Sequence, residues 1–198
     1  MNNKIAGLFK TYLETLTWSD KVAGLVQTAN VRVKKDDSPV EKSYPVSCDV
    51  TAEDCIKGEY HALTPDSKKK SVIYFEDHGG CSLIEREGNR LKFSCKLRIV
   101  VWLNLKLIQG TSCNSGVSGC GSSGDYVIEV IKKLPTRPFA SGDFISIYIS
   151  DISQVERSVD IFSRYTYSEV TTQYLMFPFD YAALDLTVEF TIPCVETP

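Results

Sequence analysis

The stretch NRLKFSCKLRIVVWLNLKLIQ, residues 89–109, alternates apolar and polar side chains over most of its length. Every odd position from Leu91 to Leu107 is apolar, whereas the first even positions carry Arg, Lys, Ser, Lys and Arg. A period of two predicts a β-strand with one buried and one solvated face. At about 3.3 Å per residue such a strand would span roughly 56 Å, against ~17–20 Å for an ordinary strand. A strand this long outgrows one compact core or rests on a neighbouring subunit.

The solvated face of this strand is basic. Arg90, Lys92, Lys96 and Arg98 project from it, and residues 89–123 contain no Asp or Glu. One interpretation is a solvated face, or one that forms ion pairs with a neighbouring strand. The other is a surface that faces DNA phosphates or an acidic subunit face. No aromatic side chains are interleaved with these cations, so the pattern does not favour stacking on single-stranded bases.

The N-terminal half of the chain predicts one helix followed by strands. Residues 4–17 carry an apolar stripe at i, i+3 and i+4 spacing, which indicates an amphipathic helix. The expected strands are residues 21–34, 44–50, 72–77 and 81–87, the first two as a hairpin. We expect a turn at residues 78–80 and a two-residue hairpin turn at Gly88-Asn89, which leads into the long strand.

The C-terminal half begins with a break in composition. Residues 109–124, QGTSCNSGVSGCGSSG, are rich in Gly and Ser and predict a flexible loop insertion. Residues 125–134 predict a helix capped by Asp125, with a strand as the alternative because several residues are β-branched. We then expect a strand at 144–150, a short helix within 151–164 and a half-exposed strand at 182–192.

Together these patterns predict a single α+β domain over residues 1–198. It should be mainly antiparallel β-sheet, with an N-terminal helix and one or two further helices. The length of 198 residues is enough for one sizeable core, and the net charge of −3 argues against a polycation that coats nucleic acid. No apolar run approaches the ~20 residues of a membrane span, and the N-terminus does not read as a signal peptide.

The seven cysteines do not predict a disulfide framework. Their number is odd and no secretion signal is visible, so reduced thiols in a cytoplasmic product are expected. Six residues separate Cys113 from Cys120 and Cys48 from Cys55, but no histidine accompanies either pair. The spacing makes a weak zinc half-site; a loop disulfide and idle thiols are the alternatives.

Candidate catalytic groups are few. His78 and Cys81 are close in sequence and could form a Cys–His nucleophile, although a turn and a strand start account for both residues. The sequence contains no phosphate-binding GK[ST] loop, GxSxG elbow, HExxH helix or GxGxxG turn. We therefore expect neither an enzyme nor a cofactor.

The overall layout resembles a phage neck protein. The likeness is carried by the N-terminal helix, the overlong hairpin and the ending at residues 177–192, FPFDYAALDLTVEFTI, in which an aromatic/Asp-Tyr entry precedes an alternating strand. Among such proteins the chain is most similar to the ring proteins below the portal in crAss-like phages of gut bacteria. The resemblance implies a tail-terminator-like or tail-tube-like fold and a non-enzymatic virion protein of the neck or tail, made in the host bacterial cytoplasm.

The resemblance also implies partners. They are further copies of the chain in a ring of twelve or six, neighbouring portal, ring or tail proteins, and the double-stranded DNA that passes through the lumen, with no membrane. Arg90, Lys92, Lys96 and Arg98 would face the DNA channel or a subunit interface. Val100 and Trp102 break the polar alternation, so under this hypothesis residues 100–107 pack on a neighbouring subunit. The alternative is a small cytoplasmic β-rich binding module or enzyme that uses the Cys/His turn or the Gly/Ser loop.

Overall fold

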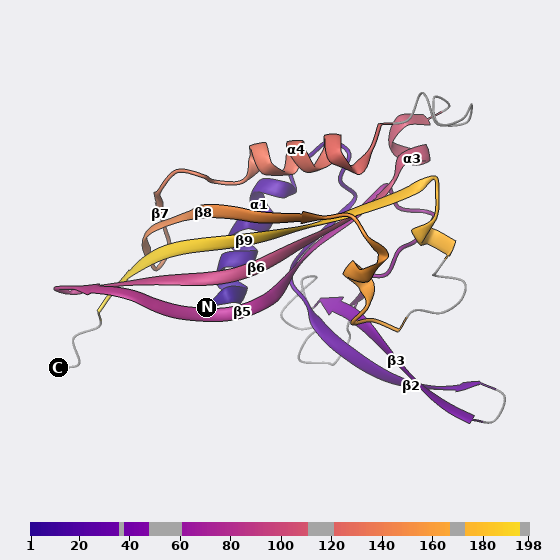
Figure 1. The fold of residues 1–198 in the computed structure, drawn as a ribbon, viewed down its shortest axis with the longest axis horizontal. Coiled ribbons are helices and arrows are strands. Elements are labelled where there is room, and N and C mark those ends of the chain that lie inside the picture. The colour runs from indigo at the N-terminus through magenta and orange to yellow at the C-terminus, as the bar shows by residue number, and fades with distance from the viewer. Residues whose placement is uncertain (36–37, 48–60, 111–120, 167–172, 195–198) are drawn as a thin grey trace.

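A computed structural model describes residues 1–35, 38–47, 61–110, 121–166 and 173–194. Within these residues the chain is an α+β protein dominated by a curled, mainly antiparallel sheet (Figure 1). The sheet has six strands in the order β1-β5-β6-β9-β8-β7, and only β1 runs parallel to its neighbour. The strands are β1 (Lys21–Leu25), β5 (Ser71–Glu87), β6 (Arg90–Asn104), β7 (Phe139–Ser141), β8 (Phe144–Glu156) and β9 (Phe179–Pro193).

A second, three-stranded sheet stands apart from the first. It consists of β2 (Gln27–Lys35), β3 (Ser38–Ser47) and the short β4 (His61–Ala62). The β2–β3 hairpin projects away from the main sheet (Figure 1). The predicted hairpin between residues 21–34 and 44–50 is thus confirmed for β2 and β3, but the first predicted strand is divided: its start, β1, pairs in the main sheet with β5 instead.

The long strand predicted from the alternation is the central strand β6. It forms a hairpin with β5 through the two-residue turn Gly88-Asn89, as predicted, with Glu87 opposite Arg90. The hairpin extends at one end of the molecule (Figure 1). The end of the strand differs from the prediction, because β6 stops at Asn104 and a short helix, α3 (Leu105–Gln109), follows. The Asn104 side chain accepts a hydrogen bond from the Leu107 backbone N–H at 3.3 Å, which caps that helix.

The turn predicted at residues 78–80 is a bulge within one continuous strand. Between Asp77 and Cys81 the register of β5 against β6 shifts, and the strand continues to Glu87. The Asp77 carboxylate accepts hydrogen bonds from the backbone N–H groups of Gly79 and Gly80 at 3.2 and 3.0 Å. Gly80 has a φ of 68°, a conformation that glycine adopts at little cost. Two glycines in a strand pattern therefore indicated a bulge as much as a turn.

The larger core lies on the face of the sheet covered by helices α1 (Asn2–Leu13) and α4 (Ser123–Lys133) (Figure 1). The odd residues of β6 from Cys95 to Leu103 are fully buried there, as the alternation predicted. The helices predicted at residues 4–17 and 125–134 are thus confirmed as α1 and α4, and the alternative of a strand at residues 125–134 is wrong. Its N-cap is Ser122 rather than Asp125; Asp125 completes a capping box by accepting a hydrogen bond from the Ser122 N–H at 3.1 Å.

A second core lies on the opposite face of the same sheet, at one end. Even residues Val100 and Trp102 are buried in it, 0% and 1% exposed, beside Tyr74 of β5 and Ala183 of β9. The segment after β8 covers them. There the predicted helix within 151–164 is wrong over its first half, because β8 continues to Glu156, and only a 3-10 turn, η2 (Val159–Phe162), follows.

Val100 and Trp102 therefore have their cover within a single chain. The Trp102 indole N–H donates to the Tyr174 carbonyl at 2.7 Å, and its ring stacks on Phe179 with centroids 5.4 Å apart. The prediction that both residues pack on a neighbouring subunit assumed that nothing in the same chain covers them, and this assumption is wrong. Both faces of β6 are apolar there because the chain folds its own second layer over the sheet.

Truncation of Trp102 should therefore destabilise the folded subunit itself. We expect Trp102→Ala to lower the free energy of unfolding by about 3–5 kcal/mol, because it leaves a cavity and an unpaired Tyr174 carbonyl. Urea unfolding followed by circular dichroism measures this. Ile128→Ala on α4, where the side chain is 52% exposed, is the control and should change stability by less than about 0.5 kcal/mol. Equal effects from both variants would contradict the assignment of Trp102 to the core.

Candidate functional site

The face of the sheet opposite α1 is polar wherever the second core does not cover it. We call this region the charged face; its charged members are Glu85, Glu87, Arg90, Lys92, Lys96, Arg98, Asp151, Glu156, Asp185 and Glu189, with His78 beside them. It contains all four basic residues that the sequence singled out, because even positions of β6 share one face. The acidic members come from β5, β8 and β9.

Arg98 is the centre of the tightest ion-pair network on the charged face. Its Nε and one terminal nitrogen donate to the two Asp185 carboxylate oxygens at 2.6 and 2.9 Å. The other terminal nitrogen donates to Glu156 at 3.1 Å. The side chains of Arg98 and Asp185 are each only 14% exposed. The hydrogen bond to Asp185 is the main reason that the pKa of Arg98 is raised further, and such a saturated guanidinium has little left to offer a phosphate.

Lys92 is paired as well. Its Nζ lies 2.7 Å from the Glu189 carboxylate, which also accepts a hydrogen bond from the Tyr148 hydroxyl at 2.6 Å. The hydrogen bonds from Lys92 and Tyr148 lower the pKa of Glu189. In the same contacts, the hydrogen bond with Glu189 raises the pKa of Lys92 and of Tyr148. The three strands β6, β9 and β8 are thus linked by one lysine, one glutamate and one tyrosine.

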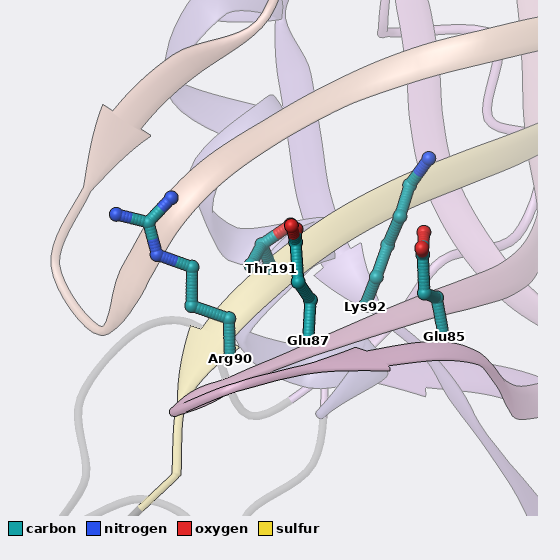
Figure 2. A pocket seen from close by; sticks show the side chains of 5 residues that line it. All are labelled: Glu85, Glu87, Arg90, Lys92 and Thr191. Carbon is teal, nitrogen blue, oxygen red and sulfur yellow. The ribbon is translucent and has the colours of Figure 1, made fainter.

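Arg90 lies in a small cleft of about 110 Å³ near the end of the β5–β6 hairpin. Figure 2 shows it with Glu85, Glu87, Lys92 and Thr191, all projecting on one side of the sheet. The register places Glu87 opposite Arg90 and Glu85 opposite Lys92. Acidic and basic side chains therefore alternate across this hairpin, and the cleft is electrically mixed.

Lys96 lines a second, wider cleft of about 320 Å³. Its other walls include His78, Asp151 and Asp185. The alkyl stem of Lys96 also lies over the backbone at Gly79 in the bulge. Within the described residues, no carboxylate lies within ion-pair distance of Lys96 or Arg90. These two cations are the part of the predicted basic surface that remains open to another molecule.

A third cleft, of about 350 Å³, lies on the other side of His78 and leads to a buried carboxylate. Glu76 is 3% exposed and accepts hydrogen bonds from the Tyr165 hydroxyl and from Arg164, the latter at 2.9 Å. These contacts tie the segment after η2 to β5. They account for Glu76 as a buried group whose charge is matched by a neighbour.

His78 and Cys81 do not form the Cys–His nucleophile considered in the sequence analysis. The His78 Nε2 lies 3.8 Å from an Asp185 oxygen, and Cys81 is bonded to Cys95 in a disulfide. The expectation of reduced thiols is therefore wrong for this pair in the structure, and Cys194 is free. Across the parts of the chain that the structure describes, no three His, Cys, Asp or Glu side chains gather as a metal site.

Two other sequence predictions fall outside the described residues. The cysteine pairs 48/55 and 113/120 lie wholly outside them, as does most of the predicted loop insertion at 109–124. Its two ends are described: Gln109 closes α3 and residues 123–124 open α4. The side-chain oxygen of Gln109 accepts a hydrogen bond from the Gly121 N–H at 3.0 Å, so the ends of this stretch lie together.

Sequence reasoning missed the acidic half of the charged face. The outward alternation of β9 did mark Asp185 and Glu189 as solvated, and only the register shows that they face Arg98 and Lys92. Glu156 was assigned to a helix, and nothing local signalled that β8 extends that far. The first interpretation of the basic strand, in which its cations form ion pairs with a neighbouring strand, therefore holds for Lys92 and Arg98.

Two comparisons with known proteins were negative. The sequence matches no model of a protein family, and a search of curated proteins finds no significant match. Among the described helices, none is long and apolar enough to cross a membrane. What the site does must therefore be argued from its own geometry.

The Arg98 network should be a strong stabilising unit. We expect Arg98→Met to lower the free energy of unfolding by about 2–4 kcal/mol, because it removes the cation that faces two poorly solvated carboxylates. In a double-mutant cycle with Asp185→Ala, the coupling energy should exceed about 1 kcal/mol. The Arg32–Glu41 pair, with side chains 80% and 68% exposed, is the matched control and should couple by less than about 1 kcal/mol. Additive effects at Arg98 and Asp185 would refute the network.

The Glu189 contacts should make stability depend on acid pH. Because its pKa is lowered on folding, the stabilisation is complete above the ordinary value of 4.5 and is lost as the pH falls through the lower, folded-state value. Glu189→Gln should be less stable than the parent protein near pH 7, and the difference should shrink as the pH falls below 4.5, as urea midpoints would show. Tyr148→Phe, which removes one of the two hydrogen bonds, should give a smaller difference. A constant gap at every pH would contradict this assignment.

Proposed function

We propose that this chain is a non-enzymatic structural subunit that assembles with further copies of itself, as a ring in a phage neck or tail around the DNA channel. The observation that carries the proposal is the long β5–β6 hairpin. Every residue of β5 from Asp77 to Glu87 is exposed, so this half of the strand contributes little to the subunit's own core. We call this part of the hairpin, residues 77–87 of β5 with their partners on β6, the arm. A segment outside the core is available for contact with another molecule.

The end of the arm carries apolar side chains. Leu83 is 55% exposed and Ile84 is 48% exposed, although charged neighbours such as Glu85 and Arg86 surround them. Exposed apolar groups rimmed by polar residues are characteristic of protein–protein contacts. A second copy of the chain is the partner that a homo-oligomeric ring supplies, through a heterologous contact that closes on itself.

The charged face fits a role near DNA without tight binding. Lys92 and Arg98 are neutralised within the subunit, and only Arg90 and Lys96 remain open. Affinity for DNA rises with the number of phosphates that a protein neutralises. A lumen lined by a mostly balanced surface would let double-stranded DNA pass without holding it. We also propose that the fold is of the tail-terminator or tail-tube type. The mainly antiparallel sheet with its N-terminal helix supports this proposal.

A second candidate function is a small-ligand binding module, favoured by the two clefts beside His78. Their volumes of about 320 and 350 Å³ are within the range of ligand sites. Ligand sites are mostly apolar, however, whereas these clefts are lined largely by charged and hydroxyl side chains, several of them already paired. The ring proposal explains more of the molecule, because it also accounts for the exposed arm.

Assembly can be tested by light scattering after size exclusion, with negative-stain images of the peak. We expect the parent chain to form a ring of six or twelve copies at high concentration or on its portal. Leu83→Asp with Ile84→Asp should reduce the mass to that of smaller species, because the charges disrupt an apolar contact. Ile128→Asp, equally exposed but on α4, is the matched control and should assemble normally. A monomer under all these conditions, with a ligand bound beside His78, would favour the binding module.

A further inference from the structure

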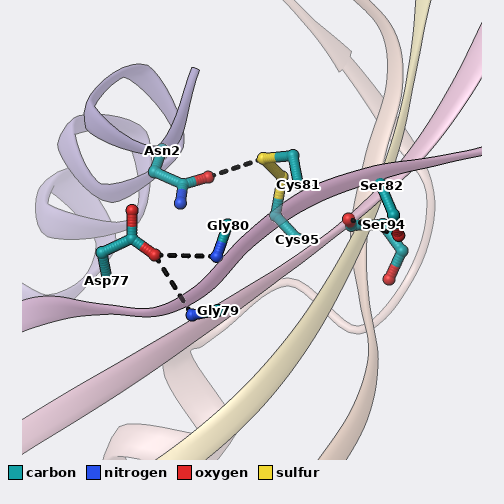
Figure 3. Close-up of a disulfide and its surroundings, with 8 residues drawn as sticks. All are labelled: Asn2, Asp77, Gly79, Gly80, Cys81, Ser82, Ser94 and Cys95. Atoms are coloured by element: carbon teal, nitrogen blue, oxygen red, sulfur yellow. Dashed lines mark hydrogen bonds between the residues drawn. A yellow bond between two sulfur atoms is a disulfide. The ribbon is translucent and has the colours of Figure 1, made fainter.

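The β5–β6 hairpin contains a cross-strand disulfide next to the bulge. Cys81 and Cys95 are directly opposite in the register of the two strands, and the structure bonds them (Figure 3). The two residues differ in exposure: Cys81 is exposed, whereas Cys95 is fully buried in the larger core. Reagents in solution therefore approach the pair from the side of Cys81, because Cys95 is covered by the core.

The surroundings of Cys81 also suit a thiol. Its Sγ lies 2.8 Å from the Oδ1 of Asn2, at the start of α1 (Figure 3). A disulfide sulfur has no proton to donate, but a thiol has one, and the Asn2 oxygen is an acceptor. Asn2 is 7% exposed and its side chain also hydrogen-bonds to Asp77, so the acceptor is held in place. The site thus accommodates both the oxidised and the reduced pair.

We propose that Cys81 and Cys95 form a thiol–disulfide exchange site that takes small-molecule disulfides of the glutathione class. The proposal does not depend on the ring. The Cys81 thiolate attacks one sulfur of glutathione disulfide, whose S–S bond breaks, and one glutathione leaves. The Cys95 thiolate then attacks the Cys81 sulfur of the mixed disulfide and releases the second glutathione. Two protein thiols lose two electrons and two protons, and glutathione disulfide gains both.

Oxidation at this position has a mechanical effect on the arm. Beyond Cys81 the arm's β5 strand is exposed throughout and, within the described residues, is paired only with β6. A covalent link across the two strands restricts their separation, because it lowers the entropy of the open state. The reduced arm therefore opens more often than the oxidised arm, whereas α4 on the core is unaffected.

The chemistry can be tested by mass spectrometry on the full chain. Samples equilibrated in buffers of different glutathione to glutathione disulfide ratio are quenched, alkylated and digested. We expect the Cys81–Cys95 disulfide to rise with glutathione disulfide. Cys95→Ser should collect a mixed disulfide at residue 81, whereas Cys81→Ser should leave the buried residue 95 unmodified. Cys194, which is free among the cysteines that the structure describes, is the labelling control. Two fully alkylated thiols at every ratio, or equal modification of both single variants, would overturn the proposal.

Hydrogen exchange tests the mechanical effect independently. Amides of residues 82–87 of β5 should exchange at least about tenfold faster in the reduced chain than in the oxidised chain, while amides of α4 stay unchanged. Equal exchange in both states would overturn the claim that the pair controls the arm. Because neither measurement uses the oligomer, failure here leaves the ring proposal untouched, and a monomeric chain leaves this one untouched.

Discussion

The structure depends on the two-sided pairing of β6. Every residue from Arg90 to Asn104 has a partner on β9, and most also have one on β5. This continuous register fixes which side chains face the helices and which face the second layer. A slip of one residue would exchange the two sets, so that basic side chains entered the core and apolar ones faced water. The larger core, the second core and the charged face are all consequences of the same register.

Much of this architecture follows from local patterns. The alternation of residues 91–103 and the apolar stripe of the N-terminal helix predicted the central strand and the helix that covers it. The Gly88-Asn89 turn was predictable because a two-residue connection needs a residue that tolerates positive φ, and Gly88 has a φ of 52°. Prediction from local patterns failed where a local pattern competes with a contact formed in the folded chain. Leu105 and Leu107 continue the alternation of β6, yet the Asn104 cap turns the chain into a helix.

The candidate site was less predictable, for a different reason. A sequence shows which residues carry charge but not which charges face one another, because strand order and register are set by the whole sheet. Arg98 reads as a free cation until Asp185 and Glu156, from 87 and 58 residues away, are placed beside it. Val100 and Trp102 likewise read as a surface for another subunit until the segment after β8 folds over them. In both cases contacts between distant segments replaced an intermolecular explanation with an intramolecular one.

The bulge at residues 77–81 divides β5 into two mechanical regimes. On one side, residues 71–76, the strand is buried in the body of the protein. On the other side, residues 77–87, it is exposed along its length and is held at one end like a cantilever. A force applied at the free end would concentrate its bending moment at the fixed end, where the bulge interrupts the ladder of hydrogen bonds. The contacts gathered there, from Asp77 to the glycine amides and from Cys81 to Cys95, lie where a stiffening bracket is most effective.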